Sequence, residues 1–193
     1  MKKLISISLL LFLLPFINGW KTVSYAQNRE IDSVLSLLLT DAADTNKVNH
    51  LNKLANSYRI AGLYDKSSRY SSDALQLAQQ LDFQKGILVA YTGIGLVYWS
   101  EGNNSGALDY FLKSLKLAEK LNDKRRKILI IGNIGNVYFG EKSYAKAQEH
   151  YFTAVKLAEE LKDTGKLAIE LLNVGNTYWT QKDIPKALSS YFR

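Results

Sequence analysis

Few side chains in this sequence could perform chemistry. The only histidines are His50 and His150, and neither has a second histidine or a carboxylate four residues further on, the spacing that would form a metal pair on a helix. The sequence contains no cysteine, which excludes disulfides, thiolate zinc sites and thiol nucleophiles. It also has no glycine-rich phosphate loop, nucleophile elbow or paired acid motif. We therefore predict no catalytic residue, no cofactor and no metal, and a protein that is not an enzyme.

One spacing recurs through most of the chain. A tyrosine appears every 40 residues: Tyr58, Tyr98, Tyr138 and Tyr178. A small residue stands three positions before each tyrosine: Ala55, Gly95, Gly135 and Gly175. Self-similarity at a fixed interval is the signature of a protein built from stacked repeats.

Each unit contains two helical patterns joined by a short turn. In the second unit the first pattern covers about 87–100 and the second about 105–121. The turn contains glycines where a positive φ is expected: Gly62 and Gly102. The next position holds residues that cap helices well: Asn103, Ser143 and Asp183. The sequence thus predicts an antiparallel helical hairpin repeated four times.

The glycines inside the first helix of each unit need a compensating gain, since each costs about 1 kcal/mol relative to alanine. The second helix offers small residues at the matching place: Ala107, Ala147 and Ala187, with Ser67 in the first unit. We expect the two backbones to approach closely there, with aromatic rings such as Tyr138 and Tyr151 alongside.

This pattern resembles the tetratricopeptide repeat. The third unit supplies the residues that carry the resemblance: Ile131, Ile134, Gly135, Tyr138, Ala147, Tyr151 and Ala154. The resemblance implies an all-α, right-handed superhelical solenoid of antiparallel helix pairs. It covers about 47–193, with repeats at about 47–86, 87–126, 127–166 and a shortened 167–193. The interval exceeds the family's usual period of about 34 residues, and this longer variant resembles exported N-terminal sensor regions of bacterial signalling proteins.

In the resembled family, one side of the first helix of each unit lines a concave groove, where asparagines hydrogen-bond a bound peptide. The candidates for this role are Asn56, Asn133, Asn136, Asn173 and Asn176. The alternative is that these amides make polar contacts within the stack. The family's clamp for a terminal carboxylate needs basic residues on this face, and the corresponding positions are uncharged: Val89, Thr92, Leu129, Gly132, Ile169 and Leu172.

Two further features are candidates for partner contacts. An aromatic residue follows the recurring tyrosine in the last three units: Trp99, Phe139 and Trp179. These rings are predicted either to form a track for a peptide or to pack between repeats. A basic run, 124–127, falls in the link between the second and third units, and we interpret it as a solvated loop or as a docking patch for an acidic partner.

The N-terminus has the layout of a secretory signal peptide. Lys2 and Lys3 precede an apolar stretch over 4–17, and Ser24 and Ala26 place small residues at the two positions that determine cleavage after Ala26. We predict a signal peptide at 1–26, a capping helix and linker at 27–46, and export to the periplasm of a Gram-negative bacterium. The alternative is an uncleaved segment that anchors the protein in the inner membrane.

The sequence therefore predicts an exported module that binds a protein or peptide, as the sensory or scaffold part of a signalling system. Without the three lysines of the N-terminal segment the net charge falls from +7 to +4, so no nucleic-acid partner is expected. If the signal peptide is cleaved, no membrane span is expected in the chain either. The alternative is an N-terminal fragment of a sensor histidine kinase or transcription regulator. Since the fourth repeat stops at Arg193, self-association through an open end is also an expectation.

Overall fold

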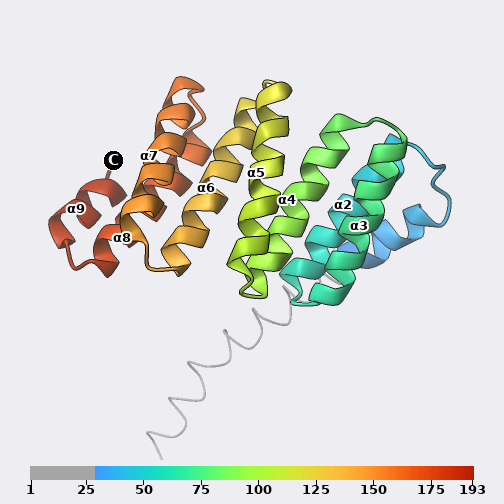
Figure 1. The fold of residues 1–193 in the computed structure, drawn as a ribbon, viewed down its shortest axis with the longest axis horizontal. Coiled ribbons are helices and arrows are strands. Elements are labelled where there is room, and N and C mark those ends of the chain that lie inside the picture. Colours follow the sequence, from blue (N-terminus) through green and yellow to red (C-terminus); the bar gives the residue numbers. More distant parts are fainter. Residues whose placement is uncertain (1–28) are drawn as a thin grey trace, which may run out of the picture.

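The computed structural model describes residues 29–193, which form only helices and turns (Figure 1). The predicted signal peptide at 1–26 lies outside the described residues. Residues 29–38 are helical, and the following helices come next in the described part of the chain: α2 (Thr45–Ile60), α3 (Tyr64–Gln80), α4 (Gln84–Ser100), α5 (Asn104–Lys120), α6 (Lys124–Gly140), α7 (Tyr144–Glu160), α8 (Thr164–Thr180) and α9 (Ile184–Tyr191). The predicted all-α solenoid of helix pairs is confirmed.

The helices follow one another as hairpins along the longest axis of the molecule (Figure 1). The first helices of the hairpins, α2, α4, α6 and α8, each contact the first helix of the next hairpin. The second helices, α3, α5, α7 and α9, contact no other second helix among the described residues. Because neighbours on the inside of a curved stack lie closer than neighbours on the outside, α2, α4, α6 and α8 form the inner, concave side.

The turns within the hairpins follow the predicted chemistry with one exception. Gly62 and Gly102 have φ of 74° and 78°, and Lys142 adopts the same conformation in the third hairpin with φ of 60°. The side chains of Asn103 and Asp183 accept hydrogen bonds from the backbone N–H groups three residues on. Ser143 also occupies the N-cap position of α7, as predicted, but its side chain makes no capping hydrogen bond.

The close approach predicted at the helix glycines has a specific cause. A Cβ added at Gly135 would lie 2.6 Å from Cε1 of Tyr151, and one added at Gly95 would lie 2.7 Å from the ring of Phe111. In each case the aromatic ring of the second helix lies directly on the glycine of the first. Both rings are buried, so the packing of a large apolar ring offsets the poor helix propensity of the glycine.

The interpretation of residues 124–127 as a loop was wrong. These residues form the first turn of α6, because the side chain of Asp123 accepts a hydrogen bond from the backbone N–H of Arg126 and caps the helix. Carboxylates also compensate the positive charge: Lys127 Nζ lies 2.7 Å from Glu119 Oε1. The run is therefore a fixed part of the scaffold.

The helix at 29–38 lies on the first hairpin. Ile31 and Val34 are buried against Leu54 and Tyr58, and Leu35 and Leu38 pack around them. This apolar contact covers the face of α2 that has no preceding repeat to pack against.

Candidate functional site

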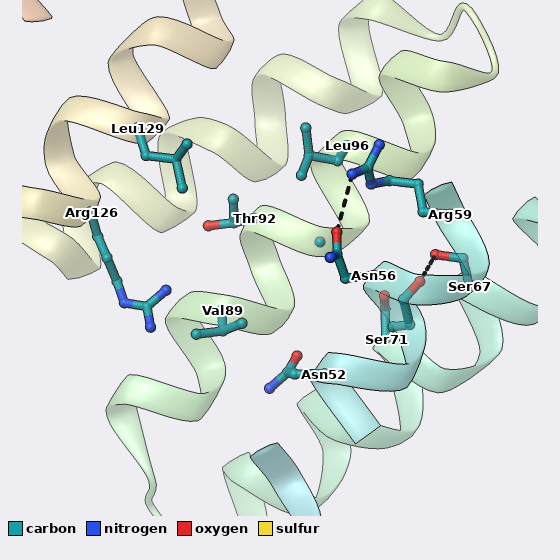
Figure 2. A pocket seen from close by; sticks show the side chains of 12 residues that line it. Asn52, Asn56, Arg59, Ser67, Ser71, Val89, Thr92, Leu96, Arg126 and Leu129 are labelled. Carbon is teal, nitrogen blue, oxygen red and sulfur yellow. Dashed lines mark hydrogen bonds between the residues drawn. The ribbon is translucent and has the colours of Figure 1, made fainter. Parts of the chain in front are cut away.

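The concave side carries a pocket of about 160 Å³ between the first three hairpins (Figure 2). A cavity of about 150 Å³ can hold benzene, so this pocket suits side chains of a partner rather than a large cofactor. The residues that line it come from α2, α3, α4 and α6: Asn52, Ala55, Asn56, Arg59, Ser67, Ser71, Val89, Thr92, Gly93, Leu96, Arg126 and Leu129.

The pocket exists because the first hairpin departs from the repeat. Ser71 stands 40 residues before Phe111, and the later hairpins have Tyr151 and Tyr191 at the same position. Where the other hairpins place an aromatic ring against a glycine, the first hairpin has the small side chain of Ser71 near Ala55. The missing ring leaves space that the backbone does not close.

Several polar groups at the pocket already have partners within the protein. Arg59 Nη2 donates to Asn56 Oδ1 at 3.1 Å, and Ser67 Oγ donates to the carbonyl oxygen of Ala55 at 2.8 Å (Figure 2). Asn52 Nδ2 donates to the carbonyl oxygen of Gly86 at 3.4 Å. Two other groups lack a hydrogen-bond partner among the described residues although they are buried, namely Arg59 Nε and Ser71 Oγ.

The electrostatic character of the pocket is positive. Two of its lining residues are arginines, Arg59 and Arg126, and none is an aspartate or glutamate. Burial lowers the pKa of Arg59 from its ordinary value, and the charge of Tyr64 opposes this shift only in part. A half-buried guanidinium group without a carboxylate beside it favours the approach of an anion.

Of the eight predicted groove residues, only Asn56 lines the pocket. Asn136 and Asn176 stand at the same repeat position, but each accepts a hydrogen bond from the tyrosine of its own hairpin: Tyr151 Oη to Asn136 Oδ1 and Tyr191 Oη to Asn176 Oδ1, both at 2.8 Å. These bonds orient the two amides. Their role in binding a peptide stays a prediction.

The other two predicted asparagines, Asn133 and Asn173, are half-buried. Asn173 Nδ2 donates to Glu170 Oε2 at 3.2 Å, and Asn133 Nδ2 is buried without a hydrogen-bond partner among residues 29–193. Asn173 therefore helps to hold a buried carboxylate. This contact agrees with the alternative interpretation, in which the amides make polar contacts within the stack.

The predicted aromatic series lies outside the pocket. Trp179 is 58% exposed and Trp99 is 37% exposed, whereas Phe139 is half-buried and packs on Tyr144 with 5.7 Å between ring centroids. Arg59 occupies the equivalent position in the first hairpin, 40 residues before Trp99. Since Arg59 lines the pocket, this position faces the concave side, and the role of the aromatic track stays a prediction.

Reasoning from the sequence missed Arg59 and Arg126. The 40-residue spacing contained a signal for Arg59, because it interrupts an aromatic series. Arg126 was assigned to a loop together with its neighbours, whereas the capped start of α6 directs it to the pocket (Figure 2).

Each of the two histidines contacts another side chain of the protein. His50 Nδ1 lies 2.7 Å from Asp41 Oδ2, and His150 stacks on Tyr138 with 5.3 Å between ring centroids. Burial lowers the pKa of His150. No group of three or more potential metal ligands gathers anywhere in 29–193.

One buried acid lies away from the pocket. Glu170 in α8 is 4% exposed and stands where Ala90 and Ile130 fill the interface of the earlier hairpins. Its carboxyl group lies directly against Gly132 of α6, where a Cβ would collide with Oε1. Burial raises the pKa of Glu170 to about 7, although Asn173 and Lys166 oppose the shift.

We expect Tyr151→Phe to destabilise the protein by about 1 kcal/mol, because it removes a hydrogen bond from a buried hydroxyl group to Asn136. Tyr191→Phe is the matched control, since its bond to Asn176 is exposed and its loss should cost less. Urea unfolding followed by circular dichroism measures both. Equal losses in the two variants would show that burial of the bond contributes nothing.

Comparison with known proteins agrees with this geometry. Residues 46–120 match the family model described as tetratricopeptide repeat. No curated protein sequence matches the chain, but solved structures share the fold of the tetratricopeptide repeats across most of it.

A Rap protein complexed with Competence and Sporulation Factor aligns over 89% of this chain and 50% of its own, with a TM-score of 0.78 and 19% identity. Aspartyl phosphate phosphatase F from Bacillus subtilis aligns over 86% of this chain and 47% of its own, with a TM-score of 0.76 and 16% identity.

A signal transduction ATPase with a tetratricopeptide repeat sensor from Pyrococcus horikoshii aligns over 83% of this chain and 25% of its own, with a TM-score of 0.71 and 19% identity. The chain thus spans half or less of these three proteins. At these identities the likeness shows the fold alone. No helix within 29–193 is long and apolar enough to cross a membrane.

Proposed function

We propose that this chain is an exported tetratricopeptide-repeat module of a bacterial signalling system and that it binds a protein or peptide on its concave side. The observation that carries the proposal is the pocket at Ser71, which has unpaired buried polar groups and is open to the concave surface. Buried polar groups that the protein itself leaves unpaired are stabilised when a ligand supplies the missing hydrogen bonds.

The proposed sensory or scaffold role is supported by what the structural neighbours do with their repeats. One structural neighbour carries its tetratricopeptide repeats as a sensor, and another was solved in complex with Competence and Sporulation Factor. The alternative proposal is that the repeats are the input region of a longer sensor kinase or transcription regulator. Sequencing the DNA beyond the codon for Arg193 tests this alternative, and an immediate stop codon would defeat it.

Site-specific photo-crosslinking tests binding on the concave side. A photoreactive residue at Leu129, which lines the pocket, is compared with one at Leu112, which is exposed on α5 outside the pocket. We expect a partner from the periplasmic fraction to crosslink at 129 and not at 112. Equal crosslinking at the two positions, or none at 129, contradicts the proposal.

A pocket-filling variant gives a second test. Ala55→Gly combined with Ser71→Phe recreates in the first hairpin the pair formed by Gly95 and Phe111. We expect this double variant to keep the fold, to unfold at a higher urea concentration because it fills a void, and to lose the crosslink at 129. Retention of the crosslink at full yield would place the ligand elsewhere.

Export is tested separately on the full chain with a C-terminal tag. If Met1 to Ala26 act as a signal peptide, the protein in the periplasmic fraction starts at Gln27 by mass spectrometry. Recovery of the full-length chain in the membrane fraction supports the uncleaved anchor instead.

A further inference from the structure

The two arginines of the pocket stand on opposite walls. Arg59 belongs to the last turn of α2, Arg126 belongs to the first turn of α6, and α4 lies between them with Val89, Thr92 and Leu96 facing the space (Figure 2). The helices α2 and α6 do not contact each other among the described elements, whereas α4 contacts both. The positive charge is therefore divided between two separate places.

The separation can be estimated from helix geometry. Arg59 is the fifteenth residue of α2 and Arg126 is the third residue of α6, and both helices run in the same direction as first members of their hairpins. Twelve residues of helix rise correspond to about 18 Å along the helix axes, and two interhelix spacings of roughly 10 Å each separate α2 from α6 sideways. The inward reach of the two arginine side chains shortens the distance between their guanidinium groups. A single carboxylate cannot fill both places at once, whereas an extended chain, at about 3.3 Å per residue, covers the distance within a few residues.

Neither arginine is fully neutralised by another side chain within residues 29–193. The Arg59 guanidinium donates only to the neutral amide of Asn56, and its Nε is buried without a partner among the described residues. Arg126 Nε lies 3.3 Å from Asp123 Oδ2, but this pair is 40% and 27% exposed. Asp123 also accepts the capping hydrogen bond from the N–H of Arg126. An exposed pair of this kind contributes little and can be replaced by a ligand carboxylate.

The surface between the two arginines is apolar. Val89 and Leu96 of α4 and Leu129 of α6 line it, and Leu129 is 42% exposed. In an extended peptide, side chains two residues apart point to the same side. A segment with a carboxylate at each end and an apolar side chain in the middle therefore complements the two arginines and the apolar surface between them.

We propose that the pocket binds an extended peptide segment with two acidic side chains about four residues apart and an apolar side chain between them, one acid at Arg59 and the other at Arg126. This inference rests on the proposed peptide-binding function and names the class of segment it recognises. It requires no terminal carboxylate, because the two cations lie apart and the remaining lining residues are uncharged.

Isothermal titration calorimetry with synthetic peptides tests the charge requirement. The probe is the sequence Glu-Ser-Leu-Ser-Glu between serine flanks, acetylated at the N-terminus and amidated at the C-terminus. The control probe has glutamine in place of both glutamates. We expect the acidic probe to bind about 10-fold tighter than the glutamine probe at low salt, and this preference to shrink at about 0.5 M salt.

Variants of the protein locate the two contacts. Arg59→Gln and Arg126→Gln are each expected to weaken the acidic probe about 5-fold or more and to leave the glutamine probe unchanged. Arg125→Gln is the matched control, because it removes the same charge from the same helical turn and does not line the pocket. Arg59→Lys should restore part of the affinity, and thermal melts monitored by circular dichroism confirm that each variant is folded.

Any one of four results would overturn the inference. The acidic and glutamine probes bind equally; or Arg125→Gln weakens binding as much as Arg126→Gln, which reduces the effect to long-range charge; or only a probe with a free C-terminal carboxylate binds. Absence of binding by every probe at about 1 mM also overturns it. In that case crosslinking at 129 still tests the proposed function. Failure of the acidic-peptide inference can therefore be distinguished from failure of binding on the concave side.

Discussion

Replacing Glu170 by glutamine is expected to stabilise the protein by about 3 kcal/mol above about pH 8 and to change its stability little at about pH 4. The carboxyl group of Glu170 is 4% exposed and lies against Gly132 of α6. Burial raises its pKa from 4.5 to about 7. The groups around it are Asn173, which donates to Oε2, and Lys166 and Tyr151, which interact with its charge.

The direction of the effect follows from proton binding. Because the pKa of Glu170 is higher in the folded protein than in the unfolded chain, the folded state binds more protons between about pH 4.5 and pH 7. The contribution of Glu170 to stability is therefore fully present below about pH 4.5 and is lost as the pH rises through about 7. Because glutamine is neutral at every pH, the Glu170→Gln variant keeps this contribution to stability as the pH rises.

Urea unfolding of the two proteins from about pH 4 to pH 9 measures this difference. Glu160→Gln is the matched control, because it makes the same exchange at an exposed residue in the last turn of α7. If the curves of the Glu170→Gln variant and the wild type run parallel, the carboxyl group has the same pKa in the folded and unfolded states, and burial does not raise it.

The repeat register predicted most of the fold because each packing contact is used again every 40 residues. Tyr138 and Gly135 have equivalents in other hairpins. One packing arrangement that buries these residues therefore serves every hairpin. The helix ends were less well predicted. The first helix of the third hairpin begins at Lys124 because Asp123 caps it, although the apolar pattern begins only later.

The pocket was not predicted because it arises where the register fails. The exchange of an aromatic residue for Ser71 is visible in the sequence, but whether the space collapses or stays open depends on how α2, α3 and α4 pack. The same holds for Glu170, whose position is apolar in the second and third hairpins, as Ala90 and Ile130. Both departures lie on the concave half of the stack or at its interfaces, where a repeat protein can vary residues without losing its hairpins.

Gly135→Ala is expected to destabilise the protein by about 2 kcal/mol, even though alanine favours helix by about 1 kcal/mol. The new methyl group would lie 2.6 Å from Cε1 and 2.8 Å from Cδ1 of Tyr151. That ring cannot move aside at low cost, since it is 2% exposed and its hydroxyl group is bonded to Asn136. The two helices of the hairpin must separate instead, which loosens the apolar contacts around them.

Gly140→Ala in the same helix separates this packing effect from helix propensity. A Cβ at Gly140 meets no atom within 4 Å, so the substitution should be neutral or stabilising by up to about 1 kcal/mol. Both variants are compared by urea unfolding. In the double variant Gly135→Ala with Tyr151→Leu the smaller side chain admits the methyl group, so the penalty of the alanine should be smaller than in the wild-type background. A Gly135→Ala protein as stable as the wild type would mean that the recurring glycine is not needed for the ring to pack, and the 40-residue glycine series would then require a cause other than helix packing.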